Sequence, residues 1–424
     1  MQVENSLLNT RKFLPLFSVQ FLNAMSDHML KNAILVMITY QGLTIGGLSP
    51  ELSVNISTLL FILPFFLFSS YAGKIADMYS KVKLIRYIKI CEIFIIVLAA
   101  TGIFSRSIEI LIFSLVAMGT HSTFFGPIKF SILPQYIKER KILLLANGYI
   151  ELGTFVAVLI GQTLGSWYMA NEELEIIVGL MAFSTFSGLI LSYRMEKTIP
   201  AGSKEKFHWN LFKDTWLSYR KITKNKKIKN NIHAISWFWA MGVVYTTQLP
   251  LFTQIYMGGC AHVFSILLAV FSISIGLGSL TCAKISDGKI VKQFVILGAI
   301  GIALFSVILI GFNFHSHDHC LSLAEFSSSW HGVVNYLLIF MIGFSAGFYS
   351  VTCYNELQVI SPIEILSQVI GVNNLLNSCY MLLCSLICIL ILFFVSLWWL
   401  FVITIISNLI FALWYWRVNF EPST

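Results

Sequence analysis

The sequence predicts an all-α membrane protein with twelve transmembrane helices, and three observations support this fold class. The chain of 424 residues contains twelve long apolar stretches, each able to span a bilayer that requires roughly 20 apolar residues per helix. Hydrophobic residues account for 57% of the chain and charged residues for only 11%, whereas a soluble domain has about 25% charged residues. Basic residues also gather at alternate helix ends. Lipid is therefore the main solvent, and a soluble enzyme is excluded.

Each predicted helix is an apolar stretch of spanning length. In chain order the helices are expected at residues 13–39, 53–76, 84–104, 108–130, 143–169, 174–195, 230–257, 262–284, 292–313, 332–354, 368–392 and 396–417. The first stretch contains Asp27 and Lys31 and is too long for the apolar core of a cleavable signal peptide. We expect it to be the first helix of the mature protein.

The basic residues predict the orientation in the membrane. Of 28 Lys and Arg residues, Arg106 is alone in the odd-numbered loops and Lys31 and Lys129 lie within helices, which leaves 25 at the ends joined by even-numbered loops. The positive-inside rule places these ends, and both termini, in the cytoplasm. The net charge of +8 is then explained by loops that meet anionic membrane lipids, and no nucleic-acid partner is expected.

The longest polar stretch, residues 197–229, contains ten Lys or Arg residues together with Pro200 and Gly202. We interpret it as a cytoplasmic linker between two halves of six helices each, residues 1–196 and 230–424.

The two halves resemble each other in sequence. Residues 73–77 (Gly-Lys-Ile-Ala-Asp) recur as residues 283–287 (Ala-Lys-Ile-Ser-Asp), an offset of 210. Segments 119–125 and 343–349 share a glycine and an aromatic pair at an offset of 224. Two matches at similar offsets indicate a duplicated unit with both copies in the same orientation. Parallel halves around a central cavity are the plan of a secondary transporter.

Residues 73–77, followed by further basic residues, resemble the signature between helices 2 and 3 of the major facilitator superfamily. The resemblance implies that Asp77 is a helix-end anion of a cytoplasmic gate, because its pairing across the halves is made in only one state. Lys74 and Asp287, in the second copy, are assigned to the same gate. The alternative is a simple turn capped by Asp between basic anchors.

The first helix carries a polar stripe that favours a substrate or coupling site. Gln20, Asn23, Asp27 and Lys31 are spaced by three or four residues, so they share one helix face. An ionisable residue within the membrane costs several kcal/mol unless it is solvated or paired. Asp27 and Lys31 are candidate site residues, with His28 as a proton-sensitive neighbour. The alternative is a structural ion pair between Asp27 and Lys31.

Other predicted helices carry further candidates for the same site. Helix 5 contains Asn147 and Glu151, and helix 11 contains Asn373 and Asn377. Lys129 of helix 4 is a candidate phosphate contact, although it can also extend to the membrane surface. Packing and hydrogen bonds between helices explain the same polar residues equally well.

Two features lie in predicted external loops. Residues 315–320 (His-Ser-His-Asp-His-Cys) contain metal-binding side chains, but we favour a solvated polar loop and expect no metal. Cys260 and Cys320 can pair in an oxidising periplasm, although two unpaired thiols are the favoured expectation. The remaining cysteines are expected to act as small apolar packing residues.

Several stretches together are similar to the bacterial lysophospholipid transporter family. They are residues 20–27 with 31–33, 121–134 (which begins His-Ser-Thr-Phe-Phe-Gly-Pro-Ile-Lys), 146–148 with Glu151 and 153–155, 235–239 with 247–250, and 276–279. The form is similar to a transporter domain fused in some bacteria to acyltransferase and acyl-carrier-protein synthetase domains. The resemblance implies inward movement of lysophospholipids such as lysophosphatidylethanolamine across the bacterial cytoplasmic (inner) membrane. It also implies reacylation by a separate enzyme, and roles for Asp27, Lys129 and Glu151.

The leading hypothesis is therefore a lysophospholipid transporter that works by alternating access. No ATPase or hydrolase motif is found, so neither an enzyme activity nor a cofactor is expected. Two alternatives stay open: a proton-coupled porter of a small polar solute or drug, and a non-transporting membrane anchor for a lipid acyltransferase.

Overall fold

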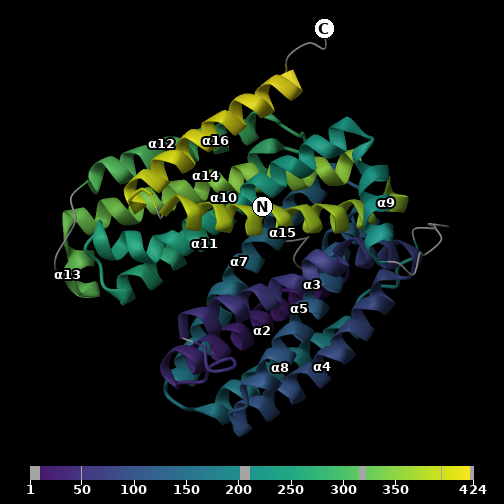
Figure 1. Cartoon of the computed structure of the whole chain (residues 1–424). Coiled ribbons are helices and arrows are strands. Elements are labelled where there is room, and N and C mark those ends of the chain that lie inside the picture. The colour runs from purple at the N-terminus through teal and green to yellow at the C-terminus, as the bar shows by residue number, and fades with distance from the viewer. Residues whose placement is uncertain (1–9, 49, 201–210, 315–320, 393, 421–424) are drawn as a thin grey trace. The chain divides into compact units, whose positions relative to one another are not determined.

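The computed structural model describes residues 10–48, 50–200, 211–314, 321–392 and 394–420 (Figure 1). Its helices are α2 (Phe13–Tyr40), α3 (Pro50–Met78), α4 (Lys81–Ser105), α5 (Ile108–Ser131), α6 (Leu133–Tyr136), α7 (Arg140–Ala170), α8 (Leu174–Tyr193), α9 (Leu211–Thr223), α10 (Lys226–Ile255), α11 (Ala261–Ser286), α12 (Gln293–Phe312), α13 (Leu323–Ser328), α14 (Trp330–Ile360), the 3-10 helix η1 (Ile363–Ile365), α15 (Leu366–Leu392) and α16 (Leu397–Phe420). The all-α prediction is confirmed, and each of the twelve predicted stretches forms a long helix.

Ten helices in the described part of the chain are long and apolar enough to cross a membrane by length and composition. The other two long helices, α2 and α10, contain 28 and 30 residues and are therefore also of spanning length. Polar residues interrupt their apolar character: α2 carries the predicted stripe with Asp27 and Lys31, and α10 begins with Lys226 and Lys227. The chain is a multi-pass membrane protein.

The helices group into two compact units. Unit 1 contains residues 1–146, 156–225 and 360–378, and unit 2 contains residues 147–155, 226–359 and 379–424. The helices α7 and α15 are thus each divided between the units. The sequence predicts two duplicated halves separated by a linker at residues 197–229. This division concerns sequence repetition rather than compactness, and it stays a prediction.

In unit 1, α4 packs against both α5 and α8, while α3 packs against α5 and α2 packs against α8. Their common core contains Met29 and Ile34 of α2, Ile103 of α4, Met118 of α5 and Met181 of α8, all fully buried. In unit 2, α12 packs on α16, and α10 contacts α11 and α16. Aromatic rings fill this second core, as in the contact of Phe252 with Phe401, whose ring centroids are 4.7 Å apart.

Close helix contact in unit 1 depends on glycine. A Cβ atom at Gly161 would lie 2.4 Å from the carbonyl oxygen of Met25, and one at Gly165 would lie 2.4 Å from that of Met29. The two glycines are one turn apart on α7, so they form a small-xxx-small face against α2. Backbone-to-backbone approach here fixes where the polar stripe of α2 is held.

The shorter helices α6, α9, α13 and η1 were not predicted from the apolar pattern. Helix α9 has 13 residues and lies within the predicted linker, where its apolar residues are too few for a span. Helix α13 begins with a capping box in which the Ser322 hydroxyl accepts from the Glu325 backbone N–H, while Glu325 accepts from the Ser322 backbone N–H. The hydrogen bonds that the Ser322 backbone N–H and hydroxyl donate to the Glu325 carboxylate lower the pKa of Glu325.

The expectation of an unpaired thiol at Cys260 is wrong, because this residue is disulfide-bonded. Its loop is also held by backbone hydrogen bonds: the Cys260 N–H donates to Leu321 O at 3.1 Å, and the Leu321 N–H donates to Gly258 O at 2.7 Å. Cys320 and the His-rich loop 315–320 lie outside the described residues.

We expect Gly165→Ala to lower the unfolding temperature in detergent relative to Gly179→Ala. Both changes improve helix propensity by roughly 1 kcal/mol. Only the added methyl at Gly165 meets backbone, since a Cβ at Gly179 has nothing within 4 Å, and such overpacking costs roughly 1–3 kcal/mol. Thermal unfolding followed by tryptophan fluorescence measures the difference. Equal unfolding temperatures would contradict the proposed backbone contact.

Candidate functional site

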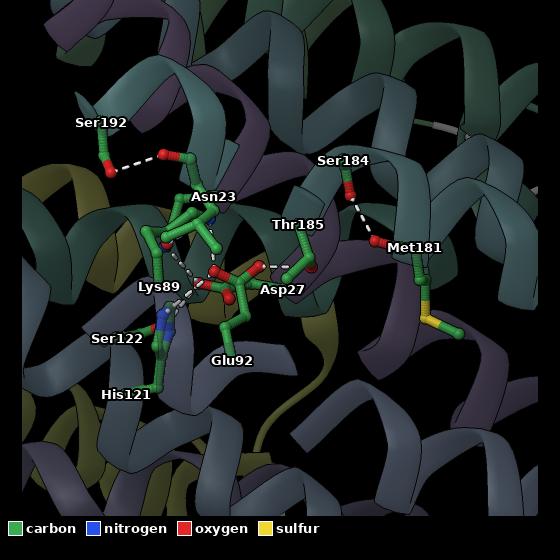
Figure 2. Close-up of polar contacts among 11 residues, drawn as sticks. Asn23, Asp27, Lys89, Glu92, His121, Ser122, Met181, Ser184, Thr185 and Ser192 are labelled. Atoms are coloured by element: carbon green, nitrogen blue, oxygen red, sulfur yellow. Dashed lines mark hydrogen bonds and ion pairs between the residues drawn. The ribbon is translucent and has the colours of Figure 1, made fainter. Parts of the chain in front are cut away.

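The densest group of buried charges lies in unit 1 and joins four helices. We call it the charged cluster; it consists of Asn23 and Asp27 of α2, Lys89 and Glu92 of α4, His121 and Ser122 of α5, and Thr185 of α8. Figure 2 shows these side chains converging, with Glu92 and Asp27 next to each other at the centre. Apart from Ser122, whose hydrogen bond is partly buried, each member is buried.

Glu92 contacts three other members of the charged cluster. It forms a short ion pair with Lys89, one turn earlier on α4. It also accepts a hydrogen bond from the Thr185 hydroxyl at 2.9 Å, and His121 Nε2 lies 3.2 Å from its Oε2. Lys89 and Glu92 are both 0% exposed, so each charge depends on the other for its stabilisation. A Cβ at Gly188 would meet the Lys89 side chain, so this glycine leaves the space that the lysine fills.

The two carboxylate oxygens of Asp27 differ in their hydrogen bonding. Its Oδ2 accepts a short hydrogen bond from Ser122 Oγ and a longer one, 3.4 Å, from Asn23 Nδ2. Its Oδ1 is buried and has no hydrogen-bond partner among the described residues. The side chain is only 7% exposed. A buried carboxylate oxygen with unused acceptor capacity is suited to bind a donor such as an ammonium group.

Two charged members of the charged cluster, Lys89 and Glu92, were missed in the sequence, as were the hydroxyl groups of Ser122 and Thr185. Lys89 was counted among the basic residues at helix ends, and this assignment is wrong because it lies inside α4 and is fully buried. The available signal was the spacing of Lys89 and Glu92, three residues apart within an apolar stretch, which places opposite charges on one helix face. The position of Lys89 near the predicted helix start concealed it.

His28 and Lys31 do not join the charged cluster. Lys31 Nζ lies over the ring of Phe61, 5.5 Å from its centroid, and within the described residues it forms no ion pair with Asp27. His28 lies on the face of α2 that meets α7, since a Cβ at Gly161 would be 3.1 Å from His28 Cβ. The alternative of a structural Asp27–Lys31 pair therefore has no support from the geometry.

The remaining candidates of unit 1 lie on α5 and α15. Lys129 Nζ is 4.8 Å from the ring centroid of Phe130. Asn373 is fully buried, and neither atom of its amide has a hydrogen-bond partner among the described residues. Asn377 is also buried. Asn374, beside Asn373, approaches Gly126 of α5, where a Cβ would lie 2.9 Å from its Nδ2.

Glu151 and Asn147 belong to unit 2, so they are not part of the charged cluster. Glu151 accepts hydrogen bonds from the hydroxyl groups of Ser279 on α11 and Ser350 on α14. Asn147 donates to Asn355 Oδ1 at 2.7 Å and to Gln358 Oε1 at 2.6 Å. Both side chains therefore connect α7 to α14 through hydrogen bonds, which also fits a packing role.

Asp77 caps the start of another helix. Its carboxylate accepts from the backbone N–H groups of Ser367 at 3.0 Å and Gln368 at 2.9 Å, in the first turn of α15. These N–H groups have no partner within their own helix, and the helix dipole favours an anion there. Lys81 Nζ lies 3.6 Å from the same carboxylate. Residues 290 positions apart in the chain are thereby joined.

The other two gate candidates differ from Asp77. Lys74 forms a buried ion pair with Asp214 of α9, with Nζ 2.6 Å from Oδ1, so the unpredicted helix α9 is tied to α3. Asp287 is exposed and follows α11 as a left-handed C-cap with φ of 43°. The repeated sequence therefore has different surroundings in its two copies.

No group of three or more metal-binding side chains occurs within the residues that the structure describes.

Unit 2 contains an apolar cavity of about 170 Å³. Its walls include Trp239, Tyr245 and Thr246 of α10, Phe271 of α11 and Ile342 of α14. Such a cavity can receive an alkyl group but offers few polar partners.

Comparison with known proteins identifies relatives. Residues 16–382 match the profile of the Major Facilitator Superfamily. The chain is 24% identical to "Lysophospholipid transporter LplT" of Cronobacter sakazakii over 365 residues, which cover 84% of this chain and 82% of the relative. It is also 24% identical to the protein of the same name from Escherichia coli O157:H7 over 343 residues, covering 80% and 78%.

We expect Lys89→Met to destabilise the protein strongly, by roughly 3–5 kcal/mol, because Glu92 is left buried without its counter-ion. The double variant Lys89→Met/Glu92→Gln removes both charges and is expected to recover most of that loss. Lys83→Met, at an exposed position of the same helix, serves as the matched control. Thermal unfolding in detergent measures all three, and a Lys89→Met protein as stable as Lys83→Met would disprove the dependence.

Proposed function

The chain belongs to the major facilitator superfamily, and we propose that it transports lysophospholipids, such as lysophosphatidylethanolamine, across the bacterial cytoplasmic membrane. It is a membrane transporter rather than an enzyme. The relatives called lysophospholipid transporters match it over most of their length. The observation that carries the substrate class is the open oxygen of buried Asp27 within the charged cluster.

The charged cluster has the chemistry that a zwitterionic headgroup requires. The free Oδ1 of Asp27 accepts from the substrate ammonium group, while Ser122 and Asn23 orient the carboxylate from the other side. Charge-assisted hydrogen bonds of this kind are the strong ones. Glu92 is already occupied by Lys89, His121 and Thr185, so Asp27 is the carboxylate that a substrate amine would pair with.

In this proposal the protein works by alternating access, with the two duplicated halves moving relative to each other. The Asp77 contacts with the start of α15 serve as one closed arrangement of the gate, which opens when those hydrogen bonds break. Both termini lie in the cytoplasm. The product reaches the cytoplasmic leaflet, where a separate acyltransferase consumes it.

We expect Asp27→Asn to reduce uptake of labelled lysophosphatidylethanolamine into proteoliposomes by about tenfold or more, since the amine loses its charged acceptor. Glu109→Gln, which neutralises an exposed carboxylate on α5, should leave uptake unchanged. Thermal unfolding of each variant shows whether the fold is kept. If the unmutated protein takes up no lysophospholipid, a porter of small polar solutes becomes the better explanation. If it transports and Asp27→Asn transports equally well, Asp27 is not the headgroup site.

We expect Asp77→Asn to slow uptake severalfold, whereas Asp287→Asn should have little effect. The neutral amide still accepts hydrogen bonds, but it loses the attraction to the helix dipole of α15 and to Lys81. Asp287 is exposed and provides the matched control from the second copy of the sequence. Initial uptake rates in proteoliposomes compare the two, and equal rates would argue against a gate at Asp77.

A further inference from the structure

Unit 2 contains a second cavity, whose lining residues differ from those of the apolar cavity and of the charged cluster. It has a volume of about 370 Å³, within the range of pockets that bind small ligands. Seven side chains from α10, α15 and α16 line it: Lys229, Asn230, His233, Trp237, Tyr380, Phe411 and Trp414. We call it the α10 pocket.

The α10 pocket has a polar end and an aromatic end. Lys229 and Asn230 come from the first turns of α10, and Lys229 is exposed. His233 follows one turn later, and its Nδ1 lies 2.9 Å from the Tyr380 hydroxyl. Trp237 follows one turn after that. The lining contains a cation and no carboxylate, so the polar end is suited to an anion.

The side chains of the aromatic end are held by ring contacts and a hydrogen bond. Trp237 stacks on Phe411 with centroids 5.6 Å apart and an interplanar angle of 11°, and its indole N–H donates to Asn408 Oδ1 at 3.2 Å. Phe411 also contacts Trp414, with centroids 5.4 Å apart. Packed rings of this kind offer a flat apolar surface, which binds alkyl chains with little loss of side-chain entropy.

We infer that the α10 pocket is a second lipid site, which binds the phosphate of a lysophospholipid through Lys229 and Asn230 and the start of its acyl chain against Trp237 and Trp414. This inference deepens the proposed function and rests on it. A cavity of about 370 Å³ favours a lipid with one chain over a lipid with two. The relevant chemistry, a phosphate joined to an apolar chain, is that of the proposed substrate.

The α10 pocket shares a wall with the apolar cavity of unit 2. Asn408, Met381 and Tyr349 line the apolar cavity. Asn408 holds Trp237, Met381 is the chain neighbour of Tyr380, and Tyr349 stacks on Phe411 at 5.7 Å. In the orientation predicted from the basic residues, Lys229 lies at the cytoplasmic end of α10. The pocket is thus placed to hold a lipid on the side where transported substrate leaves.

Binding is tested with lysophosphatidylethanolamine that carries a brominated acyl chain, which quenches nearby tryptophan fluorescence, added to the full chain in a non-ionic detergent. Lys229→Gln should weaken the apparent affinity about tenfold, the loss expected for one charge-assisted contact. Lys226→Gln, an exposed lysine of the same helix end, should bind like the unmutated protein. The double variant Trp237→Phe/Trp414→Phe should lose most of the quenching.

Equal affinities of Lys229→Gln and Lys226→Gln would overturn the inference, and so would undiminished quenching in the double tryptophan variant. Competitors separate the lipid classes. Unlabelled lysophosphatidylethanolamine should displace the probe, while a two-chain phosphatidylglycerol and a phosphate-free monoacylglycerol should not. Displacement by either of these as effective as by the lysolipid would also overturn it.

Uptake assays keep this inference distinct from the proposed function. If uptake depends on Asp27 but lipid binding does not depend on Lys229, only the inference about the α10 pocket is overturned. A chain that takes up no lysophospholipid would remove the transport proposal, and the quenching result would still decide whether the pocket binds the lipid.

Discussion

The ion pair between Lys89 and Glu92 is the interaction on which the arrangement of unit 1 depends. Either charge alone, buried inside a membrane helix, would cost several kcal/mol, so neither can be present without the other. Glu92 then contacts His121 of α5 and Thr185 of α8, and Lys89 Nζ lies 3.5 Å from Asn23 Oδ1 of α2. One pair on α4 therefore fixes three further helices by polar contacts, in a solvent where apolar packing alone discriminates poorly between orientations.

The same constraint explains why Asp27 is available. Ser122 follows His121 on α5, so the contact that brings His121 to Glu92 also brings a hydroxyl group to Asp27. This hydrogen bond orients Oδ2 of Asp27. The close approach of α7 to α2 at Gly161 and Gly165 fixes the position of α2, which carries Asp27. The two carboxylates of the charged cluster therefore differ. Glu92 has its partners inside the protein, whereas Oδ1 of Asp27 has no hydrogen-bond partner among the described residues and is the oxygen that we propose for the ligand.

The helices could be predicted from sequence because long apolar stretches have few alternatives in a membrane. The charged cluster could be predicted only in part. Asp27 interrupts an apolar stretch in its middle, where no charged residue is expected. Lys89 lies near a helix start, where the positive-inside rule expects lysine for another reason. The ion pair of Lys74 with Asp214 could not be predicted from the sequence. It joins residues 140 positions apart, and Asp214 lies in a helix that the apolar pattern does not show.

A repeated sequence does not impose a repeated role. The segments that end at Asp77 and Asp287 share their Lys and Asp spacing, yet Asp77 is fully buried and Asp287 is exposed. The difference follows from the neighbours: the first turn of α15 supplies two N–H groups to Asp77, and burial makes those bonds stronger than they would be in water. At Asp287 the left-handed backbone, with φ of 43°, ends α11, and the side chain is exposed. A movement of α15 would break the contacts of Asp77 with its first turn, and for this reason we propose Asp77 as a charge of the gate.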